Sequence, residues 1–369
     1  MTLVRADGAV RPGVRSLSSL MPALLGGDRI DWLPEPVQDA RATVALLLDG
    51  LGWQILEAHR ADLPNLASLT GRSISTVVPS TTATALTSFT TGLAPAAHGV
   101  LGYRFREGPS VLNALRWTRD DGHRPPDPFA VQRHAPFRGR PIPVVTKSEF
   151  ATTGFTNAHL RGTRFFGWST PAMLVHHLQA LVSQGERFVY GYYPGVDSVA
   201  HEFGLSGRWL EAELVAVDRL VGDLLDGLPE WCALLVTADH GLVEIEPEGW
   251  LSLFDLSSLV DTYAGEGRFR TLFARRGAAA DLAEAARDRF GAVSWVFTRD
   301  ELFDEGWLGG PAPTASVRRR LGDVVLAPFG PVAFADPNLP RETALRAVHG
   351  SLTTAEMTVP LIASRGRGA

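Results

Sequence analysis

The stretch Ala42-Thr43-Val44-Ala45-Leu46-Leu47-Leu48-Asp49-Gly50-Leu51-Gly52 decides the fold. Its first seven residues are apolar or β-branched without interruption, which is typical of a strand that is buried on both faces of a sheet. Open α/β sheets bind ligands beyond the carboxyl ends of their strands, and Asp49 falls at that position. An aspartate there is equally typical of a helix cap, so Asp49 is a candidate that needs support from the rest of the chain.

Two later apolar strands are also followed by an acid. The first leads to Asp197 and, four residues on, to His201, a spacing that places a carboxylate and an imidazole on one face of a helical turn. The second leads directly to Asp239 and His240. An isolated Asp/His pair is usually structural, but acids at three strand ends predict a shared site at one edge of the sheet.

The alternation of these strands with amphipathic helices indicates an α/β/α sandwich with a mostly parallel central sheet. The predicted strands after the first are residues 187–193 and 231–237. We expect the core domain to consist of residues 1–250 and 341–369. The alternation of apolar strands with amphipathic helices stops at residues 251–340. We expect these residues to form a smaller α+β insertion, in which residues 323–327 and 332–334 pair as a hairpin.

Residues 103–140 show neither helical nor strand periodicity, so the sequence predicts a long loop there. A loop of this length inside a compact domain is usually functional or disordered. We therefore expect an insertion near residues 103–165 that acts as a lid or as a wall of the substrate site.

The sequence Val78-Pro79-Ser80-Thr81-Thr82-Ala83 predicts a strand, a turn and the start of a helix. Pro79 ends strand pairing, helical spacing follows Thr82, and Gly92 ends the helix. Because a helix N-terminus offers free N–H groups and the positive end of the helix dipole, this turn can hold a phosphate. Hydroxyls also cap ordinary helices. Thr82 is a candidate nucleophile because acids at the ends of other strands are expected to lie near it.

The candidate site residues share oxygen or nitrogen donors and positions at strand ends. They are Asp49, Asp197, His201, Asp239, His240 and His349, with the hydroxyl of Thr82 beside them. This mixture of ligands suits two zinc ions per chain, and Mn²⁺ is an alternative because such ligands accept both metals. Two metals about 3.5–4 Å apart can hold the attacking and leaving oxygens of a displacement at phosphorus. Coordination would also activate the hydroxyl of Thr82, which is inert at neutral pH.

Composition excludes several other classes of protein. The formal net charge of -5 over 369 residues gives no electrostatic basis for nucleic acid or an anionic membrane as the main partner. Cys232 is the only cysteine, so neither an intrachain disulfide nor a cysteine-rich zinc site can form. No apolar run approaches the length of a membrane span, and the apolar stretch at residues 20–25 is too short for a signal peptide. We expect a soluble, cytoplasmic protein and leave its oligomeric state open.

Five motifs in this order resemble the alkaline phosphatase superfamily, and most closely its nucleotide pyrophosphatase/phosphodiesterase branch. The motifs are Asp49-Gly50, Pro79-x-x-Thr82, Asp197-x-x-x-His201-x-x-Gly204, Asp239-His240-Gly241 and His349-Gly350. The resemblance implies that one zinc is held by Asp49, Asp239 and His240. It implies that the other zinc is held by Asp197, His201 and His349.

The resemblance also implies a reaction in two displacements. Thr82 would attack phosphorus to give a phospho-threonine intermediate, and water oriented by the second zinc would hydrolyse it, with net retention at phosphorus. The implied substrate is a small-molecule phosphate ester of nucleotide type, and the implied enzyme is a phosphodiesterase or nucleotide pyrophosphatase.

Departures from the family pattern leave alternatives open. Ala85 stands where the branch has an asparagine that binds a phosphate oxygen, Ala83 where it has an aromatic residue beside the base, and Thr81 where it has a lysine. A phosphomonoesterase or a phosphonate-cleaving hydrolase of the same superfamily is therefore an alternative, and a metal-binding protein without turnover is a remote one. Tyr192 matches a tyrosine of the family, which either lines the pocket or is buried in the sheet.

Overall fold

The computed structural model describes residues 3–5, 7–26 and 30–368. The central strand of its main sheet is β3 (Ala42–Leu48). From edge to edge the sheet contains β4 (Thr70–Ser75), β20 (Thr358–Arg365), β11 (Cys232–Thr237), β3, β10 (Phe188–Tyr193), β8 (Pro143–Lys147) and β9 (Arg164–Trp168). All strands run parallel except β20. Every residue of β3 is buried, as its apolar sequence predicts. The predicted fold class, with a mostly parallel central sheet, is confirmed.

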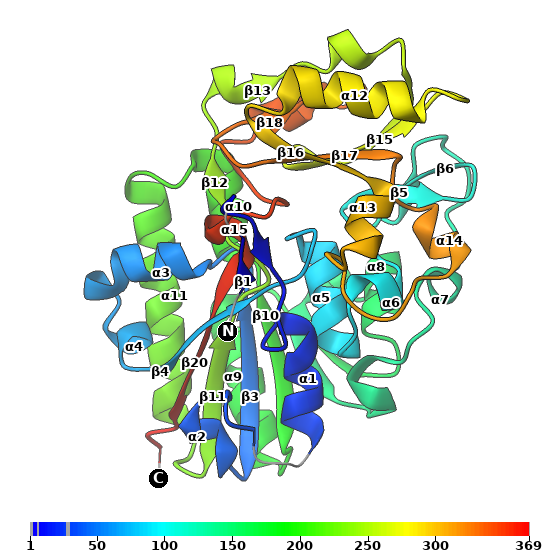
Figure 1. The fold of residues 1–369 in the computed structure, drawn as a ribbon. Coiled ribbons are helices and arrows are strands. Elements are labelled where there is room, and N and C mark those ends of the chain that lie inside the picture. The colour runs from blue at the N-terminus through cyan, green and yellow to red at the C-terminus, as the bar shows by residue number, and fades with distance from the viewer. Residues whose placement is uncertain (1–2, 6, 27–29, 369) are drawn as a thin grey trace.

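Helices cover both faces of this sheet (Figure 1). Helix α9 (Pro171–Ser183) connects β9 to β10, and α11 (Arg208–Gly227) connects β10 to β11, so both crossovers move toward the β4 edge of the sheet. Helix α5 (Thr82–Thr91) belongs to the connection from β4 to β8, which runs in the opposite direction. Because such crossovers are right-handed, α5 lies on the opposite face, where α1 (Leu17–Gly26) packs against it. Helix α11 buries residues at helical spacing, namely Leu210, Leu214, Val217 and Val221. In the described part of the chain, no helix is both long and apolar enough to cross a membrane.

A smaller α+β unit lies beyond one end of the sheet (Figure 1, top). Its antiparallel sheet consists of β14 (Val260–Glu266), β15 (Phe269–Ala274), β17 (Val324–Pro328) and β16 (Ser294–Thr298), with α12 (Ala279–Phe290) packed against it. The predicted hairpin is wrong. Strand β17 pairs with β15 and β16, while β18 (Ala333–Phe334) pairs in parallel with β13 (Trp250–Leu251).

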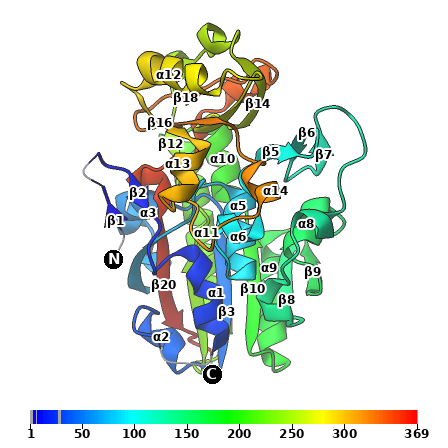
Figure 2. The same cartoon turned by 45° about the vertical axis from the view of Figure 1, so that its right-hand side comes forward.

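The prediction of a long loop at residues 103–140 is also wrong. Strands β5 (Arg104–Glu107), β6 (Ser110–Asn113) and β7 (Thr118–Arg119) form a small antiparallel sheet there, beside the α+β unit (Figure 2). The strand pattern was hidden because Arg104 is buried, where an arginine is expected to be exposed. Its guanidinium is paired with Asp336 at 2.6 Å and with Asp120.

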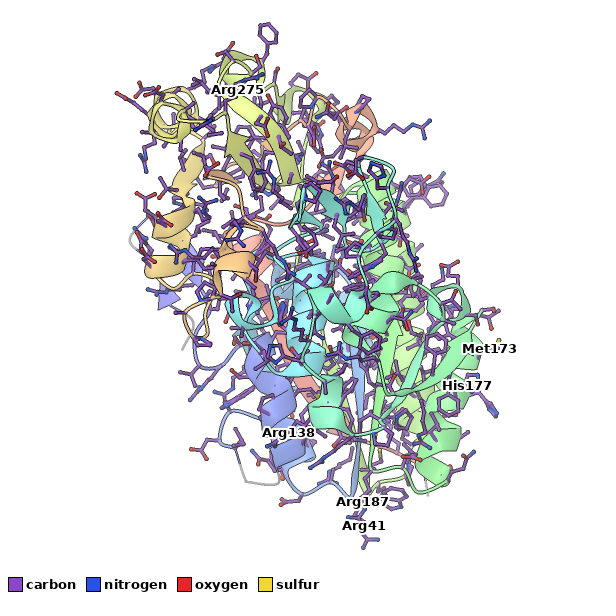
Figure 3. The ribbon with its side chains drawn as sticks, turned by 90° about the vertical axis from the view of Figure 1, so that its right-hand side faces the viewer. Arg41, Arg138, Met173, His177, Arg187 and Arg275 are labelled. Carbon is purple, nitrogen blue, oxygen red and sulfur yellow. The ribbon has the colours of Figure 1, made fainter. Side chains whose placement is uncertain are left out.

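The orientation of the sheet decides where a site can form. Arg41 and Arg187 directly precede β3 and β10, and in Figure 3 they lie at the opposite end of the molecule from Arg275 of the α+β unit. The carboxyl ends of the parallel strands therefore face the α+β unit. Ligands of open α/β sheets bind at that edge.

A buried ion pair ties the α+β unit to the core. Arg268, in the turn between β14 and β15, donates from Nε and Nη2 to the two carboxylate oxygens of Glu356, at 2.7 and 2.8 Å. Both side chains are fully buried. Glu356 lies in the short helix α15 (Thr354–Met357), and its backbone carbonyl accepts a hydrogen bond from the N–H of Gly241, in the loop after β11. The pair thus links the α+β unit to two loops at the carboxyl edge of the sheet.

Replacement of Glu356 by alanine is expected to lower the free energy of unfolding by about 3–5 kcal/mol, because it leaves the Arg268 guanidinium buried without its partner. Urea denaturation measures the change. Arg287→Ala is the matched control, since it breaks a pair with Glu301 that is largely exposed and is expected to lose about 0–1 kcal/mol. Equal losses in the two variants would contradict the role given to the buried pair.

Candidate active site

Neighbouring strands deliver three aspartates to one place. β3 lies between β11 and β10, so Asp49, at the end of β3, lies between the loops that follow both neighbours. The N–H of Asp49 donates to the carbonyl of Tyr193 at 2.9 Å, and the N–H of Asp197 donates to the carbonyl of Asp49 at 3.1 Å. On the other side, the N–H of Gly50 donates to Oδ1 of Asp239 at 3.0 Å. The backbone itself therefore holds the three carboxylates together.

Glycines permit this close approach. Gly50 has a φ of 74°, and a Cβ there would lie 2.9 Å from the Cα of Asp197. A Cβ on Gly52 would lie 2.6 Å from the Cα of Gly241. Any side chain at these positions would push the loops after β3, β10 and β11 apart.

The six predicted ligands all lie at this edge, and five of them form two groups. Within each group, the candidate ligand atoms lie within 4.8 Å of one another. The groups are Asp197 with His201 and His349, and Asp49 with Asp197 and His240. Asp239 adjoins the second group, with its Oδ2 atom 3.4 Å from Nε2 of His240. Asp197 belongs to both groups, so two cations bound here would be adjacent.

The three histidines are oriented in the same way by backbone carbonyls. The bonds join Nδ1 of His201 to Ala347 O (2.6 Å), Nδ1 of His240 to Gly241 O (3.1 Å) and Nδ1 of His349 to Ser80 O (3.1 Å). Because a carbonyl oxygen only accepts, each Nδ1 must carry the proton of its bond. Each Nε2 therefore remains for groups at the site, as in histidines that ligate metals, and Nε2 of His201 lies 3.2 Å from Oδ2 of Asp197.

Carboxylate oxygens at the site lack compensation. Oδ1 of Asp49, Oδ1 of Asp197 and Oδ2 of Asp239 are buried and have no hydrogen-bond partner among the described residues. Burial, together with the charges of the other two aspartates, raises the pKa of Asp49 well above its usual value. An isolated buried carboxylate is strongly disfavoured. Oxygen and nitrogen donors in this arrangement fit divalent cations such as Zn²⁺ or Mn²⁺.

Thr82 lies next to these groups at the first residue of α5. Its Oγ1 atom is 3.1 Å from Nε2 of His240, and the residue is 8% exposed. No side chain caps the N-terminus of α5: the hydroxyl of Thr81 donates to Oε2 of Glu266 at 2.9 Å and accepts no hydrogen bond from the first turn of the helix. The helix therefore presents uncapped N–H groups beside a hydroxyl, an arrangement suited to binding an anion.

Glu266 is a site residue that was not predicted from the sequence. It ends β14 in the α+β unit, and its Oε2 atom lies 3.7 Å from Nδ1 of His349. Oε1 is buried without a partner among the described residues, and burial raises the pKa of Glu266 to about 8. No sequence motif distinguishes Glu266 from other acids at strand ends. Its place in the site follows only from the packing of the α+β unit on the core.

A cavity of about 460 Å³ lies beside Thr82 and Asp49. Its apolar wall includes Leu86, Leu115, Phe150, Phe155, Leu160 and Tyr192. Residues 115–160 supply much of this wall. They lie within residues 103–165, which the sequence predicts to form a lid or a wall of the substrate site. Tyr192 combines the two roles that the sequence left open, since it lies in β10, lines the cavity and donates its hydroxyl proton to Oδ2 of Asp49.

Solved structures share this fold. Murine ectonucleotide pyrophosphatase/phosphodiesterase 5 matches with a TM-score of 0.68 at 13% identity, over 89% of this chain and 90% of that chain. An inactive threonine-to-alanine variant of it, in complex with AMP, matches with a TM-score of 0.67 at 13% identity over the same shares. Phosphonoacetate hydrolase from Sinorhizobium meliloti 1021, in complex with phosphonoformate, matches with a TM-score of 0.64 at 18% identity, over 90% of this chain and 91% of that chain.

No curated protein matches the sequence. The model of the family "Type I phosphodiesterase / nucleotide pyrophosphatase" matches residues 43–351, a range that includes every candidate ligand and Thr82. This match confirms the resemblance to the nucleotide pyrophosphatase/phosphodiesterase branch of the alkaline phosphatase superfamily. The chain belongs to the type I phosphodiesterase/nucleotide pyrophosphatase family and is a hydrolase of phosphate-ester bonds.

Proposed function

We propose that the protein is a zinc-dependent phosphodiesterase or nucleotide pyrophosphatase that forms a phospho-threonine intermediate on Thr82. The observation that carries this proposal is the position of the Thr82 hydroxyl, at the uncapped start of α5 and 3.1 Å from Nε2 of His240. Uncompensated carboxylate oxygens lie in the same place. A nucleophile, an anion-binding helix end and ligands for cations thus share one pocket.

In this proposal two zinc ions bind to the six ligands. Asp49, Asp239 and His240 would hold the first zinc, and Asp197, His201 and His349 the second. When bound, the two ions supply Lewis acidity that stabilises the charge on the attacking and leaving oxygens. The membership of Asp197 in both groups supports adjacent sites.

The protein's own residues position the reactants. Thr82 Oγ1 forms a bond to phosphorus as the bond to the leaving oxygen breaks, and water then cleaves the bond between Thr82 and phosphorus. The N–H groups at the start of α5 bind the non-bridging oxygens. The carbonyl bonds of the histidines keep each Nε2 directed to the site. Glu266 accepts a hydrogen bond from the Thr81 hydroxyl, and that hydroxyl does not occupy the first N–H groups of α5, which are left for the phosphate.

The cavity favours a nucleotide-like substrate over a small phosphonate. Its wall is largely apolar, and Arg116, the one arginine or lysine among the described residues that line it, is exposed. A murine relative of the same fold is known in complex with AMP, which supports a nucleotide-like ligand. The similar fold of phosphonoacetate hydrolase supports the phosphonate-cleaving alternative. Rates on bis(p-nitrophenyl) phosphate, p-nitrophenyl phosphate and phosphonoacetate separate the diesterase from the monoesterase and phosphonatase alternatives.

The Thr82→Ala variant is expected to lose turnover of bis(p-nitrophenyl) phosphate by a factor of about 1,000 or more, because it removes the nucleophile. Its zinc content, measured by mass spectrometry of the metal, should stay near that of the wild type. Ser80→Ala and Thr81→Ala are the matched controls in the same turn. Loss of turnover in either control, with activity retained in Thr82→Ala, would show that the nucleophile is misassigned.

Zinc is expected to stabilise the metal-free protein, because the cations compensate the three clustered carboxylates. At a zinc concentration about 100 times the dissociation constant, the gain is about 2.7 kcal/mol, which corresponds to a rise in Tm of about 3–6 °C. Differential scanning calorimetry after chelation and zinc addition measures it.

Two variants sharpen this test. Asp197→Asn should lose most of the rise, because Asp197 belongs to both ligand groups. Asp218→Asn should keep it, because Asp218 binds the N–H of Leu66 and the side chain of Asn65 outside the site. An unchanged Tm in the wild type on addition of zinc would overturn the proposed metal site.

A further inference from the structure

Three segments from distant parts of the chain meet beside His349. Its Nδ1 atom donates to the carbonyl oxygen of Ser80 at 3.1 Å, and the N–H of Ser80 donates to the carbonyl oxygen of Gly350 at 3.2 Å. Glu266, from the α+β unit, brings its Oε2 atom to 3.7 Å from the same Nδ1. The nitrogen of His349 that does not face the proposed zinc therefore lies beside a carboxylate.

The position of Glu266 differs from that of the other acids at the site. The aspartates lie near Nε2 atoms: Asp197 is 3.2 Å from Nε2 of His201, and Asp239 is 3.4 Å from Nε2 of His240. They thus lie on the side of the ring from which a cation would be bound. Glu266 lies on the Nδ1 side of its histidine, so the imidazole ring stands between its carboxylate and a cation on Nε2.

The carboxylate of Glu266 fits closely into this place. Gly350 has a φ of 128°, and a Cβ there would lie 3.1 Å from Cγ and 3.2 Å from Oε1 of Glu266. Oε2 accepts the proton of the Thr81 hydroxyl at 2.9 Å. Oε1 is buried and has no hydrogen-bond partner among the described residues. Because a buried oxygen without a partner costs stability, the packing of the α+β unit does not by itself explain this carboxylate.

We propose that Glu266 is a positioning residue that strengthens the binding of a cation by His349. A negative charge beside Nδ1 makes Nε2 a better ligand, because it stabilises the positive charge that the ring acquires when a cation binds. The cation in turn supplies positive charge that stabilises the buried carboxylate.

The inference rests on the proposed function, which assigns His349 to the second zinc. It deepens that function because it makes the affinity of one metal site depend on a residue of the α+β unit. The same carboxylate binds Thr81, the residue before the nucleophile. Glu266 therefore connects the α+β unit both to a metal ligand and to the turn that carries Thr82.

Glu266→Gln tests the proposal with little change of shape. The amide oxygen can still accept the hydrogen bond from Thr81, but the charge is lost. Loss of the group behind a ligating histidine typically weakens metal binding by about 10–100-fold, so one zinc dissociation constant is expected to rise by that factor while the other changes by less than about twofold. Titration of the metal-free protein with zinc against a chromogenic chelator, at a fixed pH, measures both constants.

Glu342→Gln is the matched control. The side chain of Glu342 is also largely buried, at 11% exposed, but its ion-pair partner is Arg270 rather than a histidine. Both zinc constants of this variant are expected to stay within about twofold of those of the wild type, because a site without shared partners acts independently.

The Tm of the metal-free Glu266→Gln variant is a second readout. Replacement of a carboxylate that only stabilises the fold would lower the Tm. Replacement of a buried charge whose Oε1 atom has no partner is expected to leave the Tm unchanged or to raise it.

The outcomes separate this inference from the proposed function. Unchanged zinc constants in Glu266→Gln, equal weakening of both constants, or the same weakening in Glu342→Gln would each overturn the inference. A lower Tm of the metal-free Glu266→Gln variant would also overturn it, because Glu266 would then act by stabilising the fold. Each of these results leaves the proposed function standing, whereas failure of the wild type to bind zinc would overturn the proposed metal site itself.

Discussion

The repulsion between three closely placed carboxylates, two of them buried, is the constraint on which the site depends. Asp49 follows β3, and Asp197 and Asp239 follow the two parallel strands that pair with β3, so the sheet brings the three together whatever their charge. Burial and the charges of the other two aspartates raise the pKa of Asp49 well above its usual value, whereas the pKa of Asp197 is lowered because the charge of nearby His201 outweighs burial. Compensation by divalent cations is the simplest account of oxygens that no protein group satisfies.

The surrounding structure supports this cluster in two ways. Gly50 and Gly52 let the loops approach without a Cβ between them, while backbone carbonyls fix the imidazoles from behind. The α+β unit then covers the edge of the sheet and contributes Glu266 to the Thr82 turn. The buried pair of Arg268 and Glu356 holds that unit in place. The part of the chain that looked least related to the chemistry thus completes the site.

The sequence was sufficient where structure is local and strongly patterned. The bounds of β3 were predicted correctly because seven apolar or β-branched residues end at an acid. The start of α5 at Thr82 followed from Pro79 and the hydroxyls. The ligands could be gathered at one edge because parallel strands share their carboxyl ends. Assignment of the six ligands to two zinc ions remains a prediction, as do the domain bounds.

Features that depend on contacts between residues far apart in the sequence could not be predicted from local patterns. Arg104 hid a strand, because its burial depends on Asp336, more than 200 residues away in the sequence. Glu266 and the pairing of β17 with β15 likewise depend on contacts that no local pattern encodes.

The most direct test of the account is the stereochemical course of hydrolysis at phosphorus. A p-nitrophenyl ester of an adenosine phosphorothioate with one configuration is hydrolysed in isotopically labelled water, and the configuration of the product is determined. Two displacements, first by Thr82 and then by water, each invert the centre, so the account predicts net retention. Net inversion would mean that water attacks the substrate directly, and it would remove Thr82 from the role of nucleophile.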